Sequence, residues 1–212
     1  MNIGIIGSGG VAKTLAAGFH AEGHTVQISS RSPEKLSEWV AEHDGMGAGT
    51  FAEVAAFGEA LVLAVKGTAA EAALDLAGAD HLRGKLVMDA TNPIEAAPPE
   101  NGVLRFFTTL DDSLMERLQR AHPDAHFVKV FSCVGQHLMV NPQLAGGPPT
   151  MFICGNDDAA KATVRELLTA FGWDTADMGG VEAARAIEPL CMLWCIPGFR
   201  ENQWRHAFKL LT

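Results

Sequence analysis

A glycine-rich turn near the N-terminus limits the fold of this chain more than any other feature. The turn, Gly7-Ser8-Gly9-Gly10-Val11-Ala12, fits the pattern G-x-G-x-x-A and directly follows the apolar run at residues 2–6. It opens a helical pattern, VAKTLAAGFHAEG, that ends in glycine. In such a motif the first glycine makes a tight turn, the second lets amides approach a pyrophosphate, and the small third residue lets helix meet strand. The context predicts a dinucleotide-binding βαβ unit.

Apolar runs alternate with amphipathic stretches along most of the chain, which indicates an α/β fold with a Rossmann-type, doubly wound and mostly parallel sheet. We expect strands at residues 2–6, 25–29, 60–65, 86–90 and 126–131. Further along, TMFICG, DDAAKATVRELLTAFG and WDTADMGG predict a strand, a helix and a short strand that extend the sheet. We therefore assign residues 1–180 to a dinucleotide-binding domain with its sheet extension. Residues 181–212 form a short C-terminal helical segment, broken near Pro197-Gly198.

The residues after the second predicted strand discriminate between nucleotides. An NAD site usually has an acidic side chain there, which accepts hydrogen bonds from the ribose hydroxyls. This chain instead has Ser30, Arg31 and Ser32, followed by Lys35 in a helix that Ser32 caps and Pro33 begins. Hydroxyls with arginine and lysine suit a 2′-phosphate, because arginine offers planar, charge-assisted donors. NADP(H) is the expected cofactor; the alternative for Arg31 and Lys35 is a solvated surface pair.

Composition narrows the choice of partners. A net charge of −9 disfavours nucleic acid or an anionic membrane surface, and 48% hydrophobic residues favour a folded core. The N-terminus lacks a basic segment before an apolar run, and the apolar stretches are short, so we expect a cytoplasmic protein without a membrane span. The cysteines show no metal-ligand spacing, so we expect free thiols packed in the core and no metal. They are Cys133, Cys154, Cys191 and Cys195.

Several motifs beyond the glycine turn occur in a specific order. They are IIGSGGVA, SSRSPEK, LVMDATNP, VKVFSCVG, MFICGNDDAAKATVRELLTAFGW and DMGGVEAARAIEPL, and together they cover nearly the whole chain. In this order and spacing the chain resembles the NADP-dependent coenzyme F-420 oxidoreductase family of small Rossmann proteins. Similar reductase domains occur at the cytoplasmic end of certain membrane metalloreductases. The resemblance implies an NADP(H)-dependent oxidoreductase.

The resemblance also implies roles for individual residues. Ser8, Gly9, Gly10 and Val11 should bind the pyrophosphate, and Ser30, Arg31 and Lys35 the 2′-phosphate. Ala64, Val65 and Lys66 should lie beside the ribose. Asn92 and Pro93 should lie near the nicotinamide. Ser132 and Cys133 should face the site of hydride transfer. Members that use deazaflavin often have histidine in place of Ser132, and the loop VGQHLMVNPQLAGG also differs from the archaeal form. These departures leave nicotinamide binding intact and the second substrate open.

The chemistry expected is hydride transfer between NADP(H) and a small-molecule redox substrate, namely a deazaflavin or another planar ligand. Two stacked rings at close range suffice for it, without a dedicated acid. Reduction of a small carbonyl or imine would require a proton donor. The chain has no tyrosine, and His137 is the best-placed candidate, although an ordinary loop histidine is the preferred interpretation. Two alternatives remain. One is reduction of flavin or chelated iron, and the other is a dinucleotide-binding sensor that catalyses no reaction.

The C-terminal segment is too short for the large helical domain of hydroxyacid dehydrogenases and pyrroline carboxylate reductases. The resulting open cleft suits a broad planar ligand, or closure by a neighbouring subunit. Residues 181–211, with Trp194 and Trp204, predict a homodimer contact, and packing within one chain is an equal alternative. Of two acidic residues in apolar surroundings, Asp89 is expected to satisfy backbone donors and Glu188 to join two helices.

Overall fold

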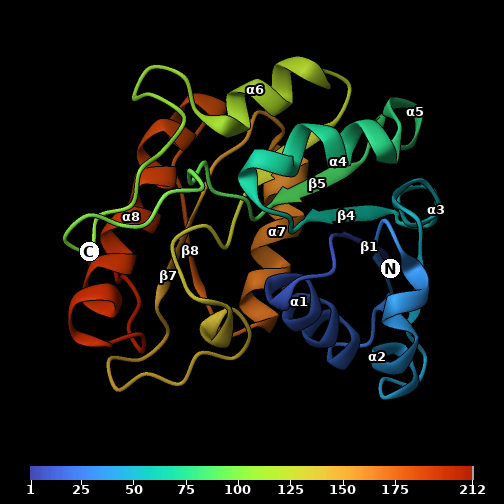
Figure 1. The fold of residues 1–212 in the computed structure, drawn as a ribbon, viewed down its shortest axis with the longest axis horizontal. Coiled ribbons are helices and arrows are strands. Elements are labelled where there is room, and N and C mark those ends of the chain that lie inside the picture. The colour runs from blue at the N-terminus through green and yellow to red at the C-terminus, as the bar shows by residue number, and fades with distance from the viewer. Residues whose placement is uncertain (212) are drawn as a thin grey trace.

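A computed structural model describes residues 1–211 of the chain (Figure 1). Its centre is a six-stranded sheet in the order β3-β2-β1-β4-β5-β6, in which every neighbouring pair is parallel. The strands are β1 Asn2–Ile6, β2 Thr25–Ser29, β3 Gly47–Gly49, β4 Ala60–Leu63, β5 Leu86–Asp89 and β6 His126–Lys129. This order, with the crossover between β3 and β4, confirms the predicted Rossmann-type fold.

Helices cover both faces of the sheet. They are α1 Gly10–Ala21, α2 Ser37–Ala41, α3 Phe51–Phe57, α4 Ala70–Ala77, α5 Ala79–Leu82, α6 Leu114–Ala121, α7 Asp158–Ala170 and α8 Ala184–Glu201. Figure 1 shows α4, α5 and α6 above the sheet and α1 and α7 below it. Alternate strand residues divide between the two layers: Ile3 and Ile5 pack with α1 and α7, whereas Leu61 and Leu63 pack with α3, α4 and α6. Burial on both faces explains the continuous apolar runs of these strands.

The predicted extension of the sheet is wrong. β7 (Thr150–Ile153) and β8 (Asp174–Asp177) form a separate two-stranded parallel sheet. The two sheets meet at one antiparallel bridge, where the Lys129 N–H donates to the Cys154 carbonyl at 2.9 Å. Gly155 lies so close to β6 that a Cβ there would be 2.5 Å from the Phe127 carbonyl oxygen. Because the chain after β7 runs antiparallel to β6 at this bridge, it cannot add a parallel strand to the central sheet.

The C-terminal segment also differs from its prediction. Helix α8 passes through Pro197 without a break and ends at Asn202, which has a left-handed φ of 54°. Gly198 serves close packing instead of a break, because a Cβ there would lie 2.2 Å from the ring of Trp204. The chain then returns along β7, where Thr150 donates its N–H to the Phe208 carbonyl at 2.8 Å. Thr212, the last residue of the predicted segment, lies outside the described residues.

The two tryptophans of this segment pack within the chain. Trp194 is buried, donates its Nε1–H to the His206 carbonyl at 2.7 Å, and stacks on the His206 ring. The ring centroids of Trp204 and Trp194 are 5.7 Å apart. These contacts fix the tail of the chain to α8. The homodimer itself stays a prediction.

A buried ion network joins the carboxyl ends of β5 and β6 to α8. Lys129 Nζ lies 2.7 Å from Asp89 Oδ2 and 2.9 Å from Glu188 Oε1, and all three side chains are at most 2% exposed. As the sequence predicts, Asp89 accepts a backbone N–H, that of Thr91, at 2.9 Å. Burial alone would lower the pKa of Lys129, but the two carboxylates outweigh this effect and raise it above its ordinary value. The lysine therefore remains charged in the core.

Glu188 also caps a helix. Its carboxylate accepts the N–H groups of Leu114 and Met115, each at 3.0 Å, in the first turn of α6. Ser113 and Glu116 form a capping box at the same end. Glu188 thus joins α8 to α6, as predicted, and neutralises part of the positive end of the α6 dipole.

We predict that Lys129→Met destabilises the protein strongly. The substitution leaves two buried carboxylates without a cation, and breaking a buried pair in this way costs about 3–5 kcal/mol. Urea unfolding at neutral pH measures the change in the free energy of unfolding. Lys35→Met, on the exposed surface after β2, serves as the control and should stay within about 0.5 kcal/mol of the parent. A loss below about 1 kcal/mol for Lys129→Met would show that the network does not hold these elements together.

Candidate functional site

The glycine turn is held by close contacts with two strands. Gly7 has φ 137°, a conformation that favours glycine, and a Cβ there would lie 2.3 Å from the Ala64 carbonyl oxygen. Its N–H donates to the hydroxyl of Ser29, at the end of β2, at 3.1 Å. The turn therefore touches the carboxyl ends of both β4 and β2. Ala12 is fully buried, which explains the small third residue of the motif.

The N-terminus of α1 is open to an anionic ligand. Gly9 occupies the cap position in an extended conformation, no side chain caps the helix, and its first turn has no acidic residue. The first backbone N–H groups of a helix have no partner within the helix. With the helix dipole, they attract negative charge such as phosphate. The chain thus has a phosphate-binding geometry at its predicted turn.

A cavity of about 470 Å³ lies beside this turn. Its volume is in the range of small-molecule sites. It is lined by Gly7, Ser8, Gly9, Ser30, Arg31, Phe51, Ala64, Val65, Lys66, Ala69, Ala72, Ala73 and Leu76. The structure therefore brings the turn, the residues after β2 and the residues after β4 to one cavity. Phe51, Ala72 and Leu76 form an apolar wall that no sequence motif indicates.

The residues after β2 are arranged around Arg31. Arg31 is exposed and lines the cavity, whereas Lys35 is exposed and lies outside the lining residues. The Ser30 hydroxyl accepts the Ser32 N–H at 3.1 Å, which shapes the turn. Ser32 does not cap the following helix through its side chain, and Pro33–Leu36 forms a 3-10 turn before α2. Ser32 and Pro33 thus stand at the predicted positions at the start of this turn, but the Ser32 hydroxyl makes no capping hydrogen bond; the Lys35 N–H is donated to the Ser32 carbonyl at 3.1 Å.

A second cavity, of about 350 Å³, adjoins the first and shares Val65 and Lys66 with it. It is lined further by Gly67, Thr68, Ala90, Asn92, Ile94, Glu95 and Ala96. Asn92 donates its side-chain N–H to the Ser132 carbonyl at 2.8 Å, so the ends of β5 and β6 meet here. Pro93, next to Asn92, is buried.

Ser132 and Cys133 are buried after β6, each about 2% exposed. The Ser132 hydroxyl has no hydrogen-bond partner within residues 1–211. Burial raises the pKa of the Cys133 thiol to about 11. The thiol is therefore protonated at neutral pH and is a poor nucleophile.

His137 is directed toward the C-terminal tail. Its Nε2 lies 2.9 Å from the Trp204 carbonyl oxygen, and because a carbonyl only accepts, Nε2 is the donor. The ring centroid is 6.4 Å from that of Trp194. The structure thus gives this histidine a contact that anchors the tail.

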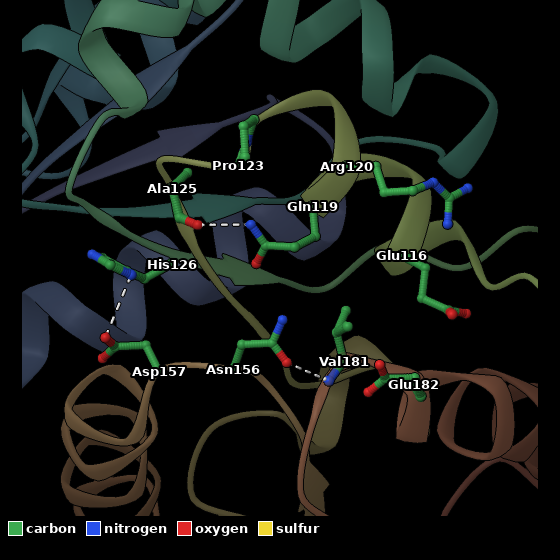
Figure 2. Close-up of a pocket in the computed structure, with 10 residues that line it drawn as sticks. All are labelled: Glu116, Gln119, Arg120, Pro123, Ala125, His126, Asn156, Asp157, Val181 and Glu182. Carbon is green, nitrogen blue, oxygen red and sulfur yellow. Dashed lines mark hydrogen bonds and ion pairs between the residues drawn. The ribbon is translucent and has the colours of Figure 1, made fainter.

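A third cavity, of about 510 Å³, lies elsewhere, around the amino end of β6 (Figure 2). Figure 2 shows the amides of Gln119 and Asn156 turned to the Ala125 carbonyl and the Val181 N–H, at 2.9 Å each. Glu116, which also lines this cavity, forms an ion pair with Arg185, and the guanidinium lowers the pKa of Glu116 to about 2. Parallel sheets bind ligands at the carboxyl ends of their strands. We therefore assign function to the two smaller cavities.

The sequence predicts neither a metal site nor a membrane-spanning helix. Within residues 1–211 no group of three His, Cys, Asp or Glu side chains could hold a metal ion. No helix in that range has the length and apolarity needed to cross a membrane.

Comparisons with known proteins agree with this geometry. The family model described as NADP oxidoreductase, coenzyme F420-dependent, matches residues 2–93. A crystal structure from Arthrobacter sp. FB24, provisionally named an F420-dependent NADP reductase, is 35% identical and covers 99% of both chains with a TM-score of 0.93. Metalloreductase STEAP3 of Rattus norvegicus is 30% identical over 92% of this chain, which spans only 38% of that relative.

More distant structures share only the fold. An imine reductase from Aspergillus terreus, in complex with NADPH4 and dibenz[c,e]azepine, is 18% identical and has a TM-score of 0.66. The match covers 93% of this chain and 62% of the reductase. By contrast, the similarity to the Arthrobacter protein extends over both chains at 35% identity. The chain therefore belongs to the family of coenzyme F420-dependent NADP oxidoreductases.

Proposed function

We propose that this protein transfers a hydride between NADP(H) and a deazaflavin or a similar planar redox ligand. The proposal rests on the 470 Å³ cavity, because the glycine turn at the open N-terminus of α1 and the exposed Arg31 both line it. The family supports the nicotinamide cofactor, and the name of the Arthrobacter protein supports the deazaflavin.

The cofactor fits this cavity with its phosphates at the charged and polar ends. The backbone of Ser8 to Val11 holds the pyrophosphate, and Arg31 and Ser30 hold the 2′-phosphate, with Lys35 contributing from the rim. The apolar wall of Phe51, Ala72 and Leu76 packs against the adenine.

The nicotinamide half would extend toward the second cavity. Ala64, Val65 and Lys66 would contact its ribose. Asn92, which lines this cavity, would position the ring, and the buried Pro93 and Ser132 would hold Asn92 in place through the chain and through its hydrogen bond to the Ser132 carbonyl. When bound, NADPH supplies a hydride from its nicotinamide ring. The chain's contribution is to align this ring and to hold Asn92 against the Ser132 carbonyl, since orientation alone can account for much of a lowered barrier.

Deazaflavin reduction needs no proton donor from the protein, because the proton that accompanies the hydride can come from solvent. Neither Cys133 nor His137 lines the two cavities: Cys133 is about 2% exposed, and the His137 Nε2–H is donated to the Trp204 carbonyl. Carbonyl or imine reduction, which requires an acid within hydrogen-bonding reach of the substrate, would instead depend on Lys66, which lines both cavities.

A second candidate is reduction of a ferric chelate. It is favoured by the similarity to metalloreductase STEAP3 over 92% of this chain. The two candidates share the NADPH site but differ in their chemistry. A ferric ion accepts one electron, so each NADPH would reduce two ferric ions, and a bound flavin would have to take up the hydride and pass on its electrons singly. Tight NADPH binding without turnover of either acceptor would instead support a dinucleotide-binding sensor.

We predict that the protein prefers NADPH to NADH and that Arg31→Ala removes the preference. Calorimetric titration of the parent protein should show at least tenfold tighter binding of NADPH, about 1.4 kcal/mol. Arg31→Ala should bind both cofactors equally, because NADH lacks the 2′-phosphate. Lys35→Ala, outside the cavity lining, should lose less of the preference. Equal binding of NADH by the parent would overturn the assignment of the 2′-phosphate site.

We predict that His137→Ala retains NADPH binding and most of the turnover of a deazaflavin. The side chain makes its hydrogen bond to the tail, so the substitution should change kcat by less than about fivefold. Steady-state assays at saturating NADPH measure the effect. A fall of about 100-fold in kcat with unchanged NADPH affinity would identify His137 as a general acid and favour carbonyl or imine reduction.

A further inference from the structure

The side chain of Gln136 lies against the open end of α1. Gln136 begins the 3-10 turn η3 (Gln136–Leu138), which follows β6 and packs on α1. A Cβ placed on Gly10 would be 2.1 Å from the Gln136 amide oxygen Oε1 and 3.1 Å from Nε2. The amide is therefore in direct contact with the first residue of the helix.

The backbone that carries Gln136 is held from both sides. Gly135 lies under the ring of Trp194, so close that a Cβ there would be 2.5 Å from Cη2. Leu138 and Met139, which follow His137, are buried, and the Met139 carbonyl accepts the Trp173 Nε1–H at 2.9 Å. The Gln136 side chain itself is exposed. A fixed backbone with a free, polar side chain is what a ligand-positioning residue requires.

The topology places this amide at the nicotinamide half of the proposed cofactor site. In the sheet order, β2 and Arg31 lie on one side of β1, whereas β4, β5 and β6 lie on the other. Gln136 comes from β6, on the side of Asn92 and Ser132, and reaches back to Gly10 on α1. It thus reaches the start of α1 from the side opposite Arg31, next to the two cavities and outside the residues that line them.

We propose that Gln136 is a cofactor-positioning residue that donates its amide N–H to the nicotinamide-side phosphate of NADP(H). This inference rests on the proposed function. An amide presents either its oxygen or its NH₂ group by turning about its last bond, so Nε2 can face a phosphate at the helix end. A neutral donor suits this place, because it adds a charge-assisted hydrogen bond to those of the α1 backbone.

Two ligands separate this role from that of Arg31. NADPH carries the 2′-phosphate, both phosphates of the pyrophosphate and the nicotinamide. Adenosine 2′,5′-bisphosphate carries only the adenosine half and lacks the nicotinamide-side phosphate. Gln136→Ala should weaken NADPH about tenfold and leave the bisphosphate unchanged within about twofold. Gln136→Glu, which has the same shape but no donor and a negative charge, should weaken NADPH further. Arg31→Ala should weaken both ligands.

Calorimetric titration of the parent and of the three variants gives the result. The thermal midpoints of the Gln136 variants should match the parent, because the side chain is exposed. The inference is overturned if Gln136→Ala binds NADPH as the parent does, or loses both ligands equally. If the parent itself binds neither ligand, the proposed cofactor site fails and the inference with it. If the parent binds both ligands and only the Gln136 variants fail to behave as expected, the cofactor site is supported and the proposed role of Gln136 is wrong.

Discussion

The charge of Lys129, buried at the end of β6, determines how the second half of the chain is assembled. A charge in the core is tolerated only when oppositely charged groups surround it, since its desolvation costs several kcal/mol. Asp89 from β5 and Glu188 from α8 supply those groups at 2.7 and 2.9 Å. Because Glu188 also caps α6, one network fixes the positions of two strands and two helices. A C-terminal helix placed otherwise would remove Glu188, one of the two carboxylates that pair with the lysine.

The same network lies next to the proposed nicotinamide end of the cleft. The chain passes from Asp89 to Asn92 within three residues, and from Lys129 to Ser132 within three more. These two ends are then joined by the Asn92–Ser132 hydrogen bond. At the other end, backbone contacts dominate, since Gly7 touches the carbonyl of Ala64 and α1 offers uncapped amides. In the proposed site the backbone therefore binds the phosphates common to both nucleotides, and the choice between them is assigned to Arg31 with Ser30 and Lys35.

Local patterns in the sequence predicted the first half of the fold well. The strands at residues 2–6 and 25–29 have the predicted bounds, because continuous apolar runs are typical of buried parallel strands. β3 was missed, since Gly47-Ala48-Gly49 has no apolar run. The placement of β7 depended on one long-range bridge to Lys129, which no local pattern contains. The proline at 197 suggested a break, but packing of Trp204 on Gly198 prevailed over that signal.

Much the same holds for the site. The glycine motif and Arg31 could be predicted, because each follows a strand directly and strand ends converge in a parallel sheet. Gln136 and Leu76 carry no such signal, since Gln136 reaches the start of α1 from a 3-10 turn and Leu76 lines the cavity from a helix surface. His137 looked like a candidate acid in sequence, and only the tail reveals its bond to Trp204.

Direct hydride transfer to a deazaflavin can be followed by moving an isotope from the cofactor to the acceptor. The protein would be incubated with NADPH deuterated on the transferred position of the nicotinamide and with an oxidised deazaflavin, and the product analysed by mass spectrometry. We expect NADPH oxidation and a reduced deazaflavin that carries the deuterium. If NADPH binds and the deazaflavin carries no deuterium, the deazaflavin is not the hydride acceptor.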